Sequence, residues 1–249
     1  MKKYLALLLI FTNPVFAEDF DLDKFMRNYG LSLFALEKLG DRQYFENHRF
    51  VRVENGELII GAQGESTNQM SYKEGDIVYS GTNNGEWGGK LDVTKGGVTE
   101  ELMKGNIVHL LPIQEKLYVI EGLAHLSMSG GSVSVLPNRK APKKPSRVTL
   151  LPDAPRLVYV DKTRPDYQPI IIVGPNSVMA LSPFEHLEIL HWKAFWSYKL
   201  APTSIARYKN YYFIGLPYGV AVLPAPWGSQ EIRFYTDPEF NKALQRTSR

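Results

Sequence analysis

The chain has 249 residues, of which 44% are hydrophobic and 12% aromatic, enough to bury a sizeable core. It contains no cysteine, which excludes disulfide bonds, thiol catalysis and thiolate metal sites. The formal net charge is +3, and two of these charges are Lys2 and Lys3, so charge gives no argument for a nucleic-acid-binding protein.

Residues 1–17 predict a cleaved secretory signal peptide. Lys2 and Lys3 form its basic start, residues 4–11 its apolar core and residues 15–17 its cleavage site. The apolar core is shorter than the ~20 residues of a membrane-spanning helix, and an uncleaved N-terminal anchor is the alternative. We expect a periplasmic or secreted mature chain that begins near Glu18 and has no transmembrane segment. With no cysteine for lipid attachment and none for disulfides, a bacterial periplasm is favoured.

Residues 18–40 predict a helical segment that packs on the following domain. The apolar residues at helical spacing are Leu22, Phe25, Met26, Tyr29, Leu33 and Leu36. Asp21 or Asp23 is the expected N-cap and Gly40 the expected end. Gly30 costs about 1 kcal/mol inside a helix, so a break into two short pieces is also open.

Residues 41–237 predict an all-β domain, followed by a C-terminal tail at 238–249. Apolar runs that end in glycine recur at 77–81, 117–122, 170–174 and 211–215, and their glycines lie 41, 52 and 41 residues apart. A period of about 40 to 50 residues built from short strands is typical of a β-propeller with four-stranded blades. We expect about five blades, with four or six as alternatives, and ring closure by strands from both termini.

The strand pattern places three clear blades at 106–137, 156–190 and 204–235, a fourth around 76–94, and a partial blade at 50–72. The repeated glycines are interpreted as positions where the backbone turns sharply or approaches a neighbouring blade. Trp87, in the glycine-rich loop at 85–90, is expected to pack between blades. The basic, proline-rich segment at 139–147 is interpreted as a solvated loop, or as a contact to an acidic partner or anionic lipid.

The sequence predicts no catalytic, cofactor-binding or metal-binding residues. The five histidines, of which His109 and His125 belong to one blade, show no metal-binding spacing, and no serine nucleophile motif is present. The carboxylate candidates for glycoside cleavage are Asp76, Glu121, Asp161, Asp166 and Glu185, which lie at strand ends or turns. They do not occupy equivalent positions in the repeat.

A dense aromatic segment links two blades and contains the candidate partner-binding residues, Trp192, Phe195, Trp196 and Tyr198. Exposed on a propeller face, these rings would anchor a protein partner or stack on sugars. Packing between blades is the alternative interpretation.

Residues 50–235 resemble β-propeller repeats, without the Trp-Asp dipeptide of WD40 repeats or the paired glycines of kelch repeats. Residues 79–89 are similar to segments of uncharacterised exported bacterial propeller proteins. The resemblance implies an exported propeller and supplies no function.

These observations favour a non-catalytic, exported protein-binding module, with an immunity-like role toward another exported or envelope protein as the concrete hypothesis. The alternative is a propeller that binds or cleaves polysaccharide with channel carboxylates. A scaffold for envelope assembly that uses the basic segment at 139–147 is a third possibility.

Overall fold

The computed structural model describes residues 20–40, 43–64, 68–126, 128–163, 169–197, 199–225 and 231–245. The predicted signal peptide therefore lies outside the described residues. Within the described part, no helix combines the length and apolarity needed to cross a membrane.

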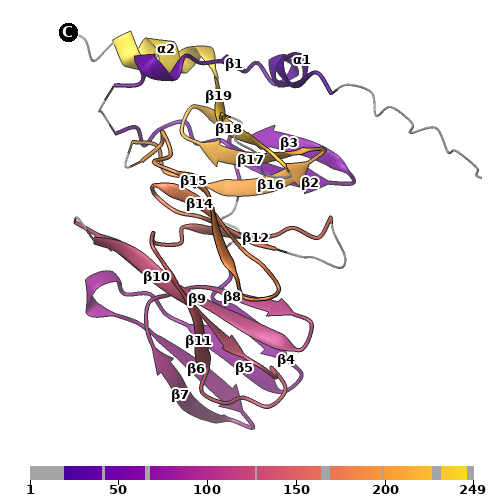
Figure 1. Cartoon of the computed structure of the whole chain (residues 1–249), viewed down its shortest axis with the longest axis vertical. Coiled ribbons are helices and arrows are strands. Elements are labelled where there is room, and N and C mark those ends of the chain that lie inside the picture. Colours follow the sequence, from indigo (N-terminus) through magenta and orange to yellow (C-terminus); the bar gives the residue numbers. More distant parts are fainter. Residues whose placement is uncertain are drawn as a thin grey trace, which may run out of the picture.

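The fold is all-β and propeller-like, as the glycine period predicts (Figure 1). A hairpin of β2 (Phe50–Glu54) and β3 (Glu57–Gly61) precedes four antiparallel sheets, in each of which four strands that are consecutive in sequence pair with one another. We call the hairpin and the four sheets the five units. The first sheet contains β4 (Ser71–Glu74), β5 (Ile77–Gly81), β6 (Lys90–Lys95) and β7 (Val98–Lys104). The second contains β8 (Ile107–Ile113), β9 (Lys116–His125), β10 (Met128–Leu136) and β11 (Ser146–Leu151). The third contains β12 (Leu157–Val160), β13 (Ile170–Val173), β14 (Ser177–Leu181) and β15 (Leu187–Trp192). The fourth contains β16 (Ser204–Tyr208), β17 (Tyr211–Leu216), β18 (Gly219–Pro224) and β19 (Arg233–Thr236).

The boundaries of the second sheet differ from the predicted blade at 106–137. The sheet extends beyond residue 137, because its fourth strand is β11, at 146–151. The basic segment therefore connects β10 to β11 within one sheet. Arg139 is held there by Glu74, with Nε and Oε2 2.7 Å apart.

The N-terminal helix is shorter than the predicted range. α1 spans Leu22–Asn28, and Asp21 caps it by accepting a hydrogen bond from the Lys24 amide at 2.9 Å. The chain leaves the helix through Gly30, at φ +70°, so the expected helix end at Gly40 is wrong and the alternative of a break at Gly30 holds. It continues as β1 (Ser32–Leu33), which pairs with β19, and a single 3-10 turn, η1 (Leu36–Lys38).

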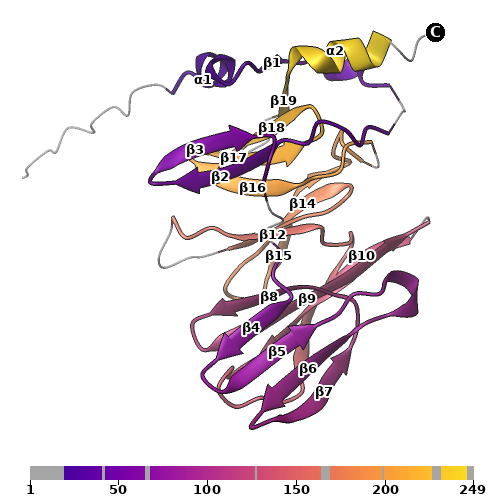
Figure 2. The ribbon, with the colours of Figure 1, turned by 180° about the vertical axis from the view of Figure 1, so that it is seen from behind.

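The C-terminal segment also folds. α2 spans Pro238–Gln245 and lies beside the N-terminal segments at one end of the long axis (Figure 2). Its Phe240 is fully buried and packs against Phe34 and Tyr44, with ring centroids 5.1 Å apart in each pair. The predicted tail is thus partly a helix tied to the core.

The middle strands are buried on both faces because alternate side chains enter different clusters. On β9, Val119 packs toward the first sheet while Tyr118 and Ile120 pack toward the third. On β17, Ile214 packs toward the third sheet while Phe213 faces the hairpin and α1. A strand whose sheet is packed between two other sheets therefore needs apolar residues at successive positions, because both of its faces are buried.

Four hydrophobic clusters join the units in a line: first to second sheet, second to third, third to fourth, and fourth to the hairpin with α1. Among the described residues, no cluster joins the hairpin to the first sheet. Figures 1 and 2 agree, with the hairpin near one end of the long axis and the first sheet at the other. Each unit thus packs against the next, as successive propeller blades do. In the described part, no apolar interface between the hairpin and the first sheet closes the series.

α1 and the hairpin share one face of the fourth sheet. β2 packs against β16 and β17, while Leu22 and Met26 of α1 join Val220 of β18 and Tyr235 of β19 in one cluster. The Tyr29 hydroxyl donates to the Leu58 carbonyl on β3 and links the helix to the hairpin. The hairpin has two strands where each sheet has at least four, and α1 covers the part of the fourth sheet that two further strands would cover.

The repeated glycines Gly81, Gly174 and Gly215 lie at or next to the end of the second strand of their sheets, and Gly122 lies three residues before the end of β9. A Cβ on Gly122 would lie within 3.0 Å of Pro155, which leads into the third sheet. A Cβ on Gly215 would lie within 3.0 Å of the Arg49 carbonyl, which leads into the hairpin. The predicted structural role, close approach of a neighbouring unit, is confirmed at these positions.

Gly61 supplies an internal comparison. It ends β3, the second strand of the hairpin, and the nearest atom to a Cβ there would be the Gln63 carbonyl at 3.7 Å. The space beside Gly61 is open because no further unit packs there.

We expect Gly215→Ala to lower the free energy of unfolding by about 1–3 kcal/mol, because the new methyl group meets backbone that cannot rotate away. Gly61→Ala is the matched control and is expected to change that energy by less than about 1 kcal/mol. Urea unfolding of both variants measures the difference. Equal effects would contradict the close-approach role.

One buried ionic cluster joins the third and fourth sheets. Asp161, at the end of β12, accepts hydrogen bonds from the side chains of Arg207 and Tyr212 and from the Thr163 hydroxyl. The Asp161 and Arg207 side chains are 1% and 10% exposed. Burial acts to raise the pKa of Asp161, but the hydrogen bonds from Thr163, Tyr212 and Arg207 outweigh it and lower the pKa below its usual value.

Because the pKa of Asp161 is lowered on folding, its contribution to stability is complete above its unfolded pKa and is lost as the pH falls through the folded pKa. We expect Asp161→Ala to cost about 3–5 kcal/mol at neutral pH, because Arg207 is left buried without its partner. The variant should also lose this component of acid sensitivity. Urea unfolding at neutral pH and from about pH 5 to 2 tests both effects, with the exposed Asp76→Asn as the control expected to behave like wild type.

Candidate functional site

The starts of the five units meet at one cleft of about 660 Å³. Its lining includes a residue that precedes or begins the first strand of every unit, namely His48, Asn68, Val108, Arg156 and Thr203. Asn83, Gly85, Leu123, Ala124 and Pro175 extend the wall. This is the position that the central channel of a propeller occupies, and it is the candidate functional site.

The chain before β4 is fixed across this cleft. The side-chain amide of Asn68 donates to the Arg156 carbonyl at 2.7 Å, and the backbone amide of Gln69 donates to Nδ1 of His109 at 2.8 Å. Burial lowers the pKa of His109 to about 4, so the ring is neutral and its nitrogen can accept. His109 therefore has a structural role in positioning one wall.

The cleft is cationic. Arg156 and His48 are the ionisable groups of its described lining, which contains no aspartate or glutamate. The Arg156 side chain is exposed toward solvent, and its Nε donates to the Pro202 carbonyl at 3.3 Å. Partial burial lowers the pKa of the guanidinium, which nevertheless stays protonated at any physiological pH.

The predicted carboxylate candidates do not come together. Asp161 is the buried structural residue described above, and Asp166 lies outside the described residues. Glu121 accepts a hydrogen bond from the Ser132 hydroxyl at 2.5 Å and lines a separate small pocket, although its neighbour Gly122 lines the cleft. The remaining two lie in exposed turns: Asp76 between β4 and β5, and Glu185 between β14 and β15. The described cleft lining thus lacks the carboxylate pair that glycoside cleavage requires.

The histidines also remain apart. His109 lies opposite Ile120 in the β8–β9 register, whereas His125 lies at the far end of β9, with Nε2 3.2 Å from a carboxylate oxygen of Glu86. Within the described part of the chain, no three histidine, aspartate or glutamate side chains are grouped as a metal site would require.

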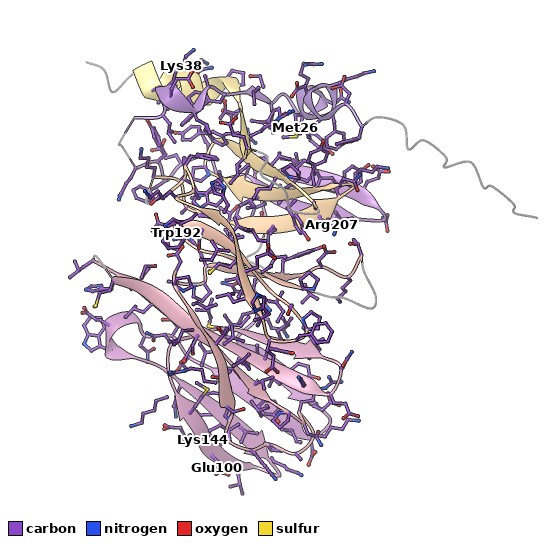
Figure 3. The ribbon with its side chains drawn as sticks, in the orientation of Figure 1. Met26, Lys38, Glu100, Lys144, Trp192 and Arg207 are labelled. Atoms are coloured by element: carbon purple, nitrogen blue, oxygen red, sulfur yellow. The ribbon has the colours of Figure 1, made fainter. Side chains whose placement is uncertain are left out.

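The predicted partner-binding aromatics divide between surface and core. Trp192 is 46% exposed at the end of β15 (Figure 3). Trp196 is fully buried, and its indole N–H donates to the Gly174 carbonyl at 3.2 Å. Phe195 is half-buried, with its ring centroid 5.3 Å from that of Trp196. Tyr198 lies outside the described residues.

The assignment of Trp196 to a contact surface is therefore corrected. Its ring belongs to the cluster between the third and fourth sheets, because the connection from β15 to β16 turns inward there. For Trp196, the alternative interpretation, packing between blades, is therefore the correct one.

An exposed apolar surface lies next to the cleft, and the sequence interpretation missed it. We call it the apolar rim: Trp87, Leu126 and Met128, which are 83%, 84% and 64% exposed. Trp87 ends η2 (Gly85–Trp87) in the β5–β6 loop, Leu126 lies in the β9–β10 turn, and Met128 begins β10. The expectation that Trp87 packs between blades is wrong, because its side chain lies in solvent although η2 itself contacts β9.

The two halves of the rim are held close to one another. Glu86 Oε2 and His125 Nε2 lie 3.2 Å apart and are the immediate neighbours of Trp87 and Leu126. Gly85 and Ala124, which line the cleft, precede these rim residues by two positions. A tryptophan in a glycine-rich loop was the one signal in the sequence for this surface.

Comparisons with known proteins assign neither a family nor an activity. No family model and no curated protein matches the chain. A GH43 glycoside hydrolase engineered for endo-xylanase and exo-arabinofuranosidase activity is 11% identical, with a TM-score of 0.37, over 70% of this chain and 42% of that one. A variant of the isopeptidase AtxE2 with a bound astexin is 14% identical, with a TM-score of 0.35, over 67% and 27%. The chain thus spans less than half of either structure.

We expect Trp196→Ala to lower the free energy of unfolding by about 3–5 kcal/mol, because it opens a cavity in the core and leaves the Gly174 carbonyl unpaired. Trp192→Ala is the matched control and is expected to change it by less than about 1 kcal/mol. Chemical denaturation of the two variants measures the contrast. A stable Trp196→Ala protein would contradict the core assignment.

Proposed function

We propose that this chain is an exported, non-catalytic propeller-like protein that binds another exported protein and neutralises or guards against it, as an immunity protein does. The observation that carries the proposal is the apolar rim beside the cationic cleft. Export is inferred from the predicted signal peptide at residues 1–17, and the number of blades stays at about five.

The rim has the chemistry of a protein-binding surface. Tryptophan is enriched among the residues that dominate binding energy, and an 83% exposed indole leaves most of its apolar area in water until a partner covers it. Leu126 is held at φ +53° in a tight turn, so its side chain is presented on a constrained backbone. A constrained surface loses little conformational entropy on binding.

Polysaccharide binding is the alternative, because the exposed Trp87 ring is also suited to stacking on a sugar. Cleavage is less well supported than binding, since the described cleft lining contains no carboxylate. The scaffold hypothesis gains little, because Arg139 of the basic segment is already paired with Glu74.

We expect the mature protein to retain one stoichiometric protein from envelope extracts and to lose it when Trp87 and Leu126 are both changed to serine. These side chains are more than 80% exposed, so the double variant should keep its stability. Phe184→Ser, at an equally exposed position in the β14–β15 turn, is the matched control and should bind normally. The readout is pull-down with quantitative mass spectrometry and a thermal melt of each variant.

Normal capture by the double variant would contradict the rim as the contact surface. If the wild-type protein retains nothing even after crosslinking, the protein-binding proposal fails, and a glycan array with the same variants tests the alternative.

A further inference from the structure

The cationic cleft contains a charge without a counterion in the described part of the protein. Arg156 lies between β11 and β12, and the hydrogen bond of its guanidinium is the one from Nε to the Pro202 carbonyl. No carboxylate of the described residues forms an ion pair with it. The two terminal nitrogens of the fork are therefore available to an acceptor from outside.

The nearest carboxylate in sequence does not fill this role. Asp153 is 1% exposed, and its two oxygens accept hydrogen bonds from the hydroxyls of Ser129 at 2.5 Å and Ser177 at 2.8 Å. Its oxygens are thus engaged within the protein, where they link the second sheet to the third. Among the described residues, Arg156 is therefore not one half of an ion pair.

The walls around Arg156 strengthen its attraction for an anion. Pro155, Pro175 and Pro202 lie in the lining and have no N–H to offer, and Phe50 and Leu123 add apolar surface. Apolar surface next to a charge excludes part of the water and strengthens its interaction with a counterion, and the polar side chains of His48, Asn68, Asn83 and Thr203 complete the described lining. The volume of about 660 Å³ is within the range of ligand-binding sites.

We propose that the central cleft binds one carboxylate, carried by an acidic side chain of the protein partner, with the Arg156 guanidinium as its bidentate donor. The choice of partner rests on the proposed function. A planar guanidinium fork matches a carboxylate in both shape and charge. A phosphate, with a charge near −2, would leave about one negative charge uncompensated among apolar walls.

The rim supports this choice of ligand because of its position. Gly85 and Ala124 belong to the cleft wall. Trp87 lies two residues after Gly85, and Leu126 lies two residues after Ala124. A protein that packs on the rim therefore covers residues that adjoin the cleft wall, and the proposal places one of its acidic side chains in the cleft.

The test is an NMR titration of the purified mature protein with a blocked Gly-Glu-Gly tripeptide, with shifts followed at the amides of the cleft lining. We expect saturable binding to wild type and a dissociation constant at least about tenfold weaker in Arg156→Gln. Arg156→Lys, which keeps the charge and loses the fork, should fall between them. Arg52→Gln, on the exposed face of β2, is the matched control and should bind like wild type.

A blocked Gly-Gln-Gly tripeptide should not bind, because it lacks the charge. Equal binding of the glutamate peptide by wild type and Arg156→Gln would overturn the site. Inorganic phosphate that binds more tightly than the peptide and displaces it would overturn the choice of a carboxylate.

The titration contains no partner protein, so its outcome is separate from that of the pull-down. Peptide binding by the cleft supports the carboxylate site even if rim variants still capture the partner. Absence of peptide binding overturns the carboxylate site even if the rim proves to be the contact surface.

Discussion

The structure depends on the burial of both faces of its middle strands. Residues such as Val119 and Ile120 on β9 point to opposite sides and enter different clusters, so the second sheet is stable only between two neighbours. The same holds for the third and fourth sheets. A chain without disulfides obtains its stability from these stacked apolar interfaces, and at the end of the stack α1 and the hairpin cover the last apolar face.

Close approach between units follows from this stacking and creates the cleft. Gly122 and Gly215 allow the entrances to the next units, at Pro155 and Arg49, to lie against the second strands. The starts of all five units then converge, and their backbone and proline side chains form the walls around Arg156. The cleft is therefore a consequence of how the sheets pack. Its cationic character comes from Arg156, the residue that precedes the first strand of the third sheet.

Two buried carboxylates have structural roles, whereas three exposed side chains at or near the cleft have few partners among the described residues. Asp161 and Asp153 are buried and use their oxygens to link adjacent sheets. Arg156 has no such partner in the described residues, and Trp87 and Leu126 have little apolar contact. Asp161 and Asp153 thus bind within the protein, whereas Arg156, Trp87 and Leu126 are open to a partner.

The sequence by itself determined the all-β class and the glycine period, and it left a break of the N-terminal helix at Gly30 open as an alternative. These are local properties, because strand alternation and turn conformation depend on residues a few positions apart. It did not determine which aromatic rings are exposed. Trp87 and Trp196 both lie in connections between strands, yet one is 83% exposed and the other fully buried. That difference, and the convergence of five distant segments at Arg156, depends on the path of each connection over sheets far away in sequence, and only the tertiary structure decides it.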